Sequence, residues 1–409
     1  MTGRVVAKRD VFTGVPFFIL IPDASWNSPA MKRTIFFLIG AVLILATIGL
    51  VMLFSASMVR GDAIYRDSTY FVTRQLLWMA LSLVAGIICA RMDLQWFRKV
   101  ALPIAGICIL CLILVRIPGI GTKINGSWRW LRFGPLNIQP SEFAKIGVIL
   151  AAAWWISRRR RYMHTFKRGL LIPMAGLGLF AMLLMVEPDL GTTALVGLVT
   201  MALLYIGGAR PRYLFGFAGA GMSALAVFLL HNENRMQRIL AFRDPEKYSQ
   251  GEAWQLINGL NAFASGGPYG VGLGNSIQKY HYLPEAHTDF ILPIIGEELG
   301  LIATLTVLIL FVVIFICGLR IAARASDDFG RFTGLGVTLM ITLQAIINLA
   351  VVTGSMPTKG IALPFISYGG SSLLVSAAMV GLLINVAHTA RDPKVKTRTA
   401  LFKDRQRTA

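Results

Sequence analysis

Residues 34–56 read TIFFLIGAVLILATIGLVMLFSA, a run of 23 residues that contains no charged side chain. The hydrocarbon core of a bilayer is about 30 Å thick, and a helix needs about 20 apolar residues to cross it. The run is long enough to do so, and it is more apolar than one face of a soluble core helix requires. It predicts a transmembrane helix, and the rest of the chain repeats the pattern.

Nine further apolar blocks follow along the chain. They lie at 71–90, 99–116, 143–157, 169–187, 190–208, 213–230, 289–319, 332–353 and 369–390. We therefore predict an all-α, polytopic integral membrane protein with about ten transmembrane helices. The block at 143–157 is short and the block at 289–319 is long, so the latter is expected to contain a kink or to begin outside the bilayer.

The composition agrees with a membrane protein and excludes a soluble nucleic-acid binder. The formal charge of +20 suggests a polyanionic partner at first, but 55% of the residues are hydrophobic and only 15% are charged. Soluble domains are about 25% charged. The four cysteines all lie inside apolar blocks, where they indicate neither a disulfide framework nor a metal site.

Lys and Arg predict the orientation, because they are retained on the cytoplasmic side of a membrane. If both termini are cytoplasmic, the inner segments hold 26 of these residues and the outer loops hold 12. The run from Arg158 to Arg161, with Lys167 and Arg168, is the strongest single contribution. Both termini are predicted to be cytoplasmic.

The domain organisation follows from the same blocks. We predict a transmembrane domain at 34–390, a cytoplasmic N-terminal extension at 1–33 and a basic cytoplasmic tail at 391–409. Residues 1–30 do not resemble a signal peptide, and we expect them to be either disordered or the product of an overlong start-site assignment. A large extracytoplasmic loop at 231–288, between helices 7 and 8, is rich in aromatic residues and is expected to fold on the membrane surface.

Ionisable side chains near membrane depth are costly and are by default candidates for function. The two cations among them, Arg74 and Lys145, are natural partners for buried carboxylates, and Lys145 shares a helix face with Glu142. Neutralising ion pairs remain as good an explanation as function for several of these residues. The acidic candidates are Glu142, Glu187, Asp189, Asp289, Glu297 and Glu298.

Asp289 is the strongest catalytic candidate. It lies where a polar outer loop turns into an apolar helix, and either His287 or Thr288 is expected to cap that helix. Pro293 follows four residues later and predicts a kink there, because proline removes a helical hydrogen bond. A carboxylate with low dielectric on one side and water on the other can serve as a general base.

Two glycine-containing motifs are better explained as a loop and a turn than as catalytic or nucleotide-binding motifs. Gly270, Gly272 and Gly274 resemble half of a dinucleotide fingerprint, but no strand precedes them, and a loop is the better interpretation. The stretch Ser367–Ser372 predicts a tight turn into the last helix, with a possible substrate contact.

Several motifs together resemble the SEDS (shape, elongation, division and sporulation) family of bacterial peptidoglycan polymerases. They occur in the family's order and fit its ten-span layout. They are Asn125-Gly126 with Arg129-Trp130, Gln139 to Lys145, Glu187 to Thr192, Arg238 to Phe242 with Asp244-Pro245, Pro284 to Phe290, Gly296 to Gly300, and Leu363 to Ser372. Residues 357–360 and 274–279 resemble the division branch, FtsW, more than the elongation branch, RodA.

The resemblance implies an inverting glycosyltransferase that polymerises lipid II, the undecaprenyl-linked disaccharide-pentapeptide, at the outer leaflet. Asp289 would be the general base, and Lys145, Arg129, Arg243, Lys359 or a divalent cation (Mg²⁺ or Mn²⁺) would receive the leaving pyrophosphate. Glu142 would position Lys145, bind a metal or stabilise the cavity. We expect His287, Ser367, Glu297 and Arg74 to support the site, and we expect no nucleotide and no haem.

The resemblance also implies partners and a location. The partners are a class B penicillin-binding transpeptidase, other divisome proteins and membrane lipid, with no nucleic acid. The location is the bacterial inner membrane, at the division septum. An elongation-type polymerase, a lipid II flippase and a non-catalytic scaffold are the alternatives; ten helices with charges at membrane depth also suit a transporter.

Overall fold

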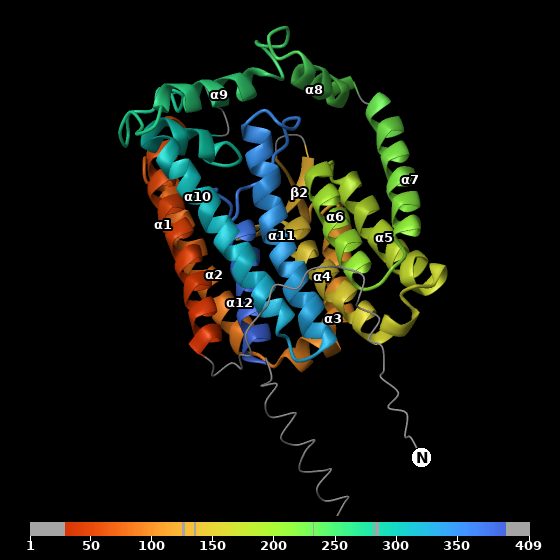
Figure 1. Ribbon diagram of the computed structural model, residues 1–409. Helices are drawn as coiled ribbons and strands as arrows, with labels where there is room; N and C mark the ends of the chain where they lie inside the picture. The colour runs from red at the N-terminus through yellow and green to blue at the C-terminus, as the bar shows by residue number, and fades with distance from the viewer. Residues whose placement is uncertain are drawn as a thin grey trace, which may run out of the picture.

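The computed structural model describes residues 29–389 except 125–126, 135, 232, 281–282 and 284–285. The predicted extension at 1–33 lies almost wholly outside the described residues, and the tail at 391–409 lies outside them entirely. Each of the ten apolar blocks forms a helix, and these helices build one bundle (Figure 1). The all-α membrane fold is confirmed.

The ends of the bundle helices differ from those of the apolar blocks. They are α1 (Pro29–Tyr65), α2 (Tyr70–Arg91), α3 (Leu94–Leu114), α4 (Pro140–Arg159), α5 (Ile172–Val186), α6 (Leu190–Ile206), α7 (Pro211–Leu230), α10 (Ile291–Ala323), α11 (Asp328–Val352) and α12 (Gly370–His388). The fourth is not short, because Pro140 begins the helix and polar residues extend both of its ends. Seven of the bundle helices are longer than their apolar blocks, whereas α5, α6 and α12 are shorter by a few residues.

The outer surface of the bundle requires an apolar solvent. Large side chains such as Phe36 and Phe215 are 72% and 77% exposed, and they belong to a ring of exposed Leu, Ile, Val and Phe around the spans. Within the described residues, seven helices are long and apolar enough to cross a membrane, counting α5 with the turn before it. The shorter α6 and the more polar α4 pack inside the bundle against α11.

The two most buried long helices, α11 and α12, form its centre. The first packs against α4, α6 and α10, and the second against α2, α4 and α10. Polar connections gather at one end of the bundle, the end predicted to be extracytoplasmic, which we call the outer end. The opposite, arginine-rich end is called the inner end.

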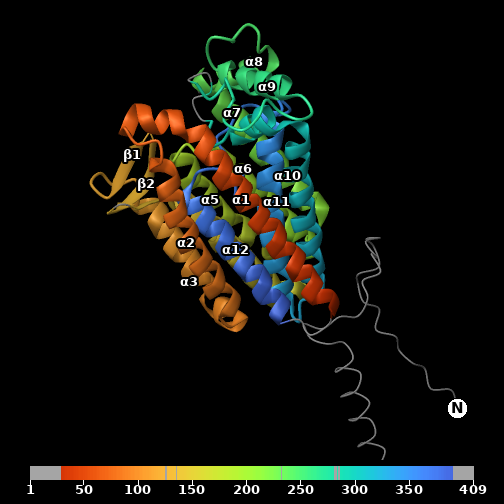
Figure 2. The same ribbon diagram turned by 90° about the vertical axis from the view of Figure 1, so that its left-hand side faces the viewer.

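The outer end carries three further elements. The connection between α3 and α4 forms a three-stranded antiparallel sheet of β1 (Gly121–Ile124), β2 (Ser127–Phe133) and β3 (Leu136–Ile138), a small addition to an otherwise helical fold. The predicted large loop contains α8 (Glu233–Arg243) and α9 (Trp254–Gly266), which lie across this end, while the sheet projects beside α2 and α3 (Figure 2).

The break in α10 does not occur where the sequence predicted it. Pro293 lies in the first turn, where its missing N–H would have no helical acceptor, so the helix tolerates it without a kink. The break is at Gly300, whose φ of 78° only glycine adopts easily. Neither His287 nor Thr288 caps α10, because the N-cap is Phe290, which makes no side-chain cap hydrogen bond.

Helices α2 and α12 approach so closely that one glycine limits their contact. A Cβ added to Gly381 would lie 2.2 Å from the carbonyl oxygen of Gly86. We expect Gly381→Ala to destabilise the protein by about 1–3 kcal/mol through overpacking. Thermal unfolding of the full chain in detergent measures the change.

The matched control is Gly106→Ala in α3, because an added Cβ there meets no atom within 4 Å. Alanine favours a helix over glycine by about 0.5–1 kcal/mol, so the control should be neutral or stabilising. An equal loss of stability in both variants would contradict the close approach.

Candidate functional site

Asp289 lies at the outer end, in the turn that precedes α10. Its side chain is half-buried and lies over the backbone of the loop 353–369, where a Cβ on Gly360 would be 2.6 Å from the Asp289 Oδ2. Only glycine at 360 leaves room for the carboxylate in this position. The sequence-predicted base is therefore held between α10 and the loop that leads to α12.

Two amides on α11 hold this arrangement together. The Nδ2 of Asn348 donates to the backbone oxygens of Asp289, at 2.9 Å, and Ile361, at 2.7 Å. One turn earlier, the Nε2 of Gln344 donates to the backbone oxygen of Ala362 at 2.8 Å. Neither residue belongs to the motifs from which the site was predicted; the available signal was two amide side chains four apart in the apolar block 332–353.

Glu142 and Lys145 form the predicted ion pair in the first turns of α4. The Lys145 Nζ lies 2.8 Å from the Glu142 Oε1 and 2.9 Å from the Gln344 Oε1, and all three side chains are buried. Gln344 therefore joins this pair to the loop beside Asp289. Of the three roles predicted for Glu142, the geometry supports the positioning of Lys145.

A second polar group surrounds the connection between α5 and α6. Arg129, on β2, donates from Nε to the Glu187 backbone oxygen at 2.7 Å and from Nη2 to that of Pro188 at 2.9 Å. Asp189 caps α6 by accepting from the Thr192 backbone N–H at 3.0 Å. Arg129 thus supports the end of α5 rather than presenting its guanidinium to a ligand.

The charges of this group influence one another. Burial and the neighbouring Asp189 raise the pKa of Glu187 to about 8, and neither of its carboxylate oxygens has a hydrogen-bond partner within the described residues. Burial lowers the pKa of Lys359, while the negative charge of Asp189 acts in the opposite direction. Lys359 is half-buried and directly precedes Gly360, and the acidic side chain that acts on its charge is Asp189.

His287 packs among aromatic rings. Its ring centre lies 4.9 Å from that of Phe71 and 5.8 Å from that of Tyr368, and its backbone oxygen accepts from the Tyr368 N–H at 3.0 Å. Burial, followed by the positive charge of Arg60, lowers the pKa of His287 to about 4. The imidazole is therefore neutral near pH 7. It packs between the turn of Asp289 and Phe71 of α2.

Three other predicted residues contact a ring, close a turn or end a helix. Arg74 lies over the Tyr70 ring, 4.6 Å from its centre. The Ser367 Oγ accepts from the Leu363 N–H at 2.8 Å and so closes the turn before α12. Arg243 is the exposed last residue of α8.

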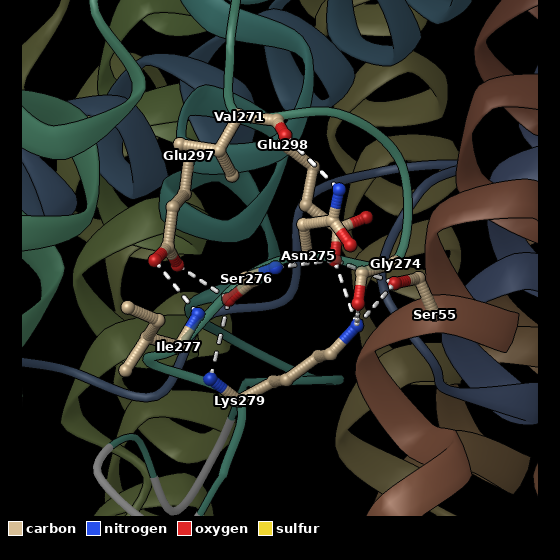
Figure 3. Close-up of polar contacts among 9 residues, drawn as sticks. All are labelled: Ser55, Val271, Gly274, Asn275, Ser276, Ile277, Lys279, Glu297 and Glu298. Atoms are coloured by element: carbon tan, nitrogen blue, oxygen red, sulfur yellow. Dashed lines mark hydrogen bonds and ion pairs between the residues drawn. The ribbon is translucent and has the colours of Figure 1, made fainter.

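Glu297 and Glu298 hold the large loop to α10, as Figure 3 shows. The Glu297 carboxylate accepts from the Ser276 hydroxyl and from the Ile277 N–H at 2.9 Å. The Glu298 Oε1 accepts from Ser55 at 2.6 Å and lies 3.0 Å from the Lys279 Nζ. The polar side chains of this group are buried, so Glu297 supports the fold beneath the site, and Glu298 belongs to a neutralising ion pair.

The arrangement supplies a half-buried carboxylate on a hydrogen-bonded frame, which suits proton abstraction from a bound substrate. Among the described residues, no group of three or more His, Cys, Asp and Glu side chains could enclose a metal ion. The ionisable residues brought to one end are Asp289, Lys359, Asp189, Glu187, Lys145 and Glu142.

Comparison with known proteins identifies related chains. The family described as "Cell cycle protein", which unites FtsW, RodA and SpoVE, matches residues 35–392. A relative from Trichlorobacter lovleyi, named probable peptidoglycan glycosyltransferase FtsW, is 41% identical over 346 residues, which cover 85% of this chain and 91% of the relative.

Solved structures show the same fold. A chain from a peptidoglycan synthase complex, described in terms of polymerization and crosslinking, matches with a TM-score of 0.71 and 27% identity, covering 86% of this chain and 96% of that one. The rod shape determining protein RodA of Thermus thermophilus matches with a TM-score of 0.64 and 25% identity, covering 86% and 96%.

Replacing Asn348 by alanine should loosen both the turn of Asp289 and the loop 353–369. Two buried backbone oxygens lose their donor, and each unsatisfied group costs about 1–3 kcal/mol. We expect a lower unfolding temperature in detergent. The control is Thr342→Val on the same helix, because among the described residues the Thr342 hydroxyl bonds to backbone oxygens of its own helix. A similar loss in both variants would contradict the bridging role.

His287 predicts a pH dependence of stability. Because its pKa is lowered in the folded chain, the unfolded chain binds the proton more tightly, and stability falls as the pH decreases from about 6.5 to about 4. At about 1.4 kcal/mol per pKa unit the loss approaches ~3 kcal/mol. Unfolding temperatures measured from pH 7.5 to 4 should fall less steeply for His287→Gln; identical slopes would show that His287 is not responsible.

Proposed function

Because the chain belongs to the FtsW, RodA and SpoVE family, we propose that it is a peptidoglycan glycosyltransferase that polymerises lipid II at the outer end of the bundle. The observation that carries the proposal is the position of Asp289. Its backbone oxygen is bound by Asn348 of α11, and its half-buried carboxylate lies over Gly360, the residue that follows Lys359. The relatives from Trichlorobacter lovleyi and Geobacter metallireducens are named probable peptidoglycan glycosyltransferase FtsW, which agrees with this chemistry.

Asp289 acts as the general base. A sugar hydroxyl is a poor nucleophile near neutral pH and must lose its proton as it attacks. The C4 hydroxyl of the acceptor N-acetylglucosamine attacks C1 of the donor N-acetylmuramic acid, and its proton passes to the Asp289 carboxylate. Undecaprenyl pyrophosphate leaves from the opposite side, so the anomeric centre inverts without a covalent enzyme intermediate.

Lys359 is the best-placed cation for the leaving pyrophosphate. Lys145 is already paired with Glu142, and Arg129 already donates to two backbone oxygens. Lys359 retains partial exposure, and a cation aimed at a developing charge stabilises the transition state more than the ground state.

A divalent cation would fit this site as a companion of the substrate. Mg²⁺ is usually held by one or two carboxylates together with phosphate oxygens, so Asp289 or Asp189 would suffice from the protein. When bound, the ion would supply additional charge for the pyrophosphate. Such an ion would be recruited with lipid II, since the described residues contain no larger ligand cluster.

We further propose that the enzyme works in the bacterial inner membrane, at the division septum, beside a class B penicillin-binding transpeptidase. A comparison of sequence identities supports the division role over elongation. The relative named FtsW is 41% identical to this chain, whereas the solved RodA is 25% identical to it. The match to a synthase complex that combines polymerization with crosslinking supports the transpeptidase partner. The remaining divisome proteins are proposed on the division role alone.

Asp289→Asn should abolish the polymerisation of purified lipid II, because the amide cannot accept the proton. The assay uses the full chain in detergent, with its transpeptidase partner, and resolves labelled glycan products by gel. The control is Asp62→Asn, which removes an exposed carboxylate of the outer end. It should keep activity within about twofold of the parent, as is usual for a surface change.

Two outcomes would overturn the proposal. Glycan synthesis by Asp289→Asn at the parent rate would remove Asp289 as the base. No glycan from the folded parent protein and its partner, together with lipid II transport in vesicles, would favour a flippase instead.

A further inference from the structure

The inner end of the bundle divides into two halves with different electrostatics. Around the beginning of α11 the arginines are paired with aspartates: Arg98 lies 3.6 Å from Asp327, and Arg331 lies 3.8 Å from Asp328. Arg160 reaches the same Asp328. Charge in this half is therefore neutralised within the protein.

The other half, around the α4–α5 connection and the beginning of α7, has no such compensation. Its exposed cations form no ion pair within the described part of the chain, and residues 146–186 and 190–232 contain no Asp or Glu. We call these cations and the rings among them the basic–aromatic patch. It comprises Arg158, Arg159, Arg161, Lys167, Arg168, Arg210 and Arg212, with Trp154, Trp155, Tyr162, Phe166 and Tyr213.

The cations of the patch lie over its rings. The Arg159 guanidinium is 5.6 Å from the centre of the Trp155 ring, and that of Arg168 is 4.5 Å from the Tyr162 ring. The Trp155 Nε1 donates to the Arg168 backbone oxygen at 2.9 Å. These contacts connect the last turn of α4 to the turn that opens α5.

The patch extends to α7 through a second set of contacts. The ring centres of Phe166 and Tyr213 are 5.2 Å apart, and Arg212 lies 4.8 Å from the Tyr213 ring. The α4–α5 connection and the beginning of α7 lie side by side at the lower right of Figure 1. Seven cations from three segments thus share one surface.

The connection that carries the patch is tightly folded. Met163 is buried at its centre, and a Cβ on Gly169 would lie 1.8 Å from the Met163 backbone oxygen. The turn from Lys167 to Leu171 is a π-helix, a rare conformation that often marks functional sites. Retention of positive charge on the cytoplasmic side requires no such rigidity, so orientation alone does not explain this structure.

From these contacts we infer that the basic–aromatic patch binds the headgroup of an anionic phospholipid from the inner leaflet. Unpaired cations repel one another, and a phosphate among them removes that cost. Tyr and Trp rings favour the depth of lipid headgroups, and basic surfaces at the cytoplasmic ends of helices recognise anionic lipids.

Exposed apolar side chains next to the patch provide for the acyl chains. Leu171 and Phe215, which follow the patch on α5 and α7, are 50% and 77% exposed. A lipid therefore meets cations at its headgroup and apolar side chains along its tails. An acidic protein segment would match only the first of these two features.

The test measures lipid retention by native mass spectrometry of the full chain in detergent, with phosphatidylglycerol and phosphatidylethanolamine added in equal amounts. We expect the parent to retain the anionic lipid about tenfold more, the size that a few interfacial cations supply. The variant Arg159→Gln/Arg168→Gln/Arg212→Gln should lose most of that preference.

The matched control removes the same charge from exposed cations of the inner end outside the patch, as Arg91→Gln/Lys99→Gln/Arg320→Gln. It should keep the preference. If the patch variant does not fold, Arg161→Gln/Lys167→Gln replaces it, because both side chains are exposed and neither lies over a ring of the described residues. Equal retention of both lipids by the parent, or equal effects of the patch and control variants, would overturn the inference.

Discussion

The break in α10 at Gly300 is the constraint on which the outer half of the molecule depends. In a membrane protein a broken helix leaves backbone groups that hydrocarbon cannot satisfy. Here the loop after α9 satisfies them: the Leu301 N–H donates to Gly267 at 2.9 Å, while the Glu297 and Glu298 backbone oxygens accept from Val271 and Gly272. An approach this close needs glycine, since a Cβ on Gly270 would lie 2.2 Å from the Glu298 backbone oxygen.

The break also determines how the turn that carries Asp289 is held. Glu297 and Glu298 end the first segment of α10, and their buried carboxylates bind residues 276–279 of the large loop. The other end of this short segment follows directly from Asp289, whose backbone oxygen is bound by Asn348. Because this segment is fixed at both ends, it holds the backbone of Asp289 in one position. A base held in this way needs little movement of the surrounding protein during the reaction.

The sequence predicted the spans and the Glu142–Lys145 pair because both follow local rules, apolar length and i,i+3 spacing. It misplaced the break, because Pro293 is harmless in a first turn and Gly300 becomes a hinge only through the loop that fills it. Gln344 and Asn348 were missed for a similar reason. The hydrogen-bond partners of Asn348 lie 13 and 59 residues away in the sequence, and Gln344 has a partner 199 residues away. No local sequence pattern predicts such contacts.

Pairing and burial leave two charged side chains of the proposed site, Asp289 and Lys359, accessible to a substrate. Lys145 is neutralised by Glu142, Lys279 by Glu298, and Arg129 is occupied by backbone oxygens. Each of these cations is needed where it lies, because a buried charge without its partner costs several kcal/mol. Asp289 and Lys359 are instead half-buried, so a substrate can reach both. One can accept the proton of the attacking hydroxyl while the other receives the charge of the departing pyrophosphate, which is the division of labour that glycosyl transfer requires.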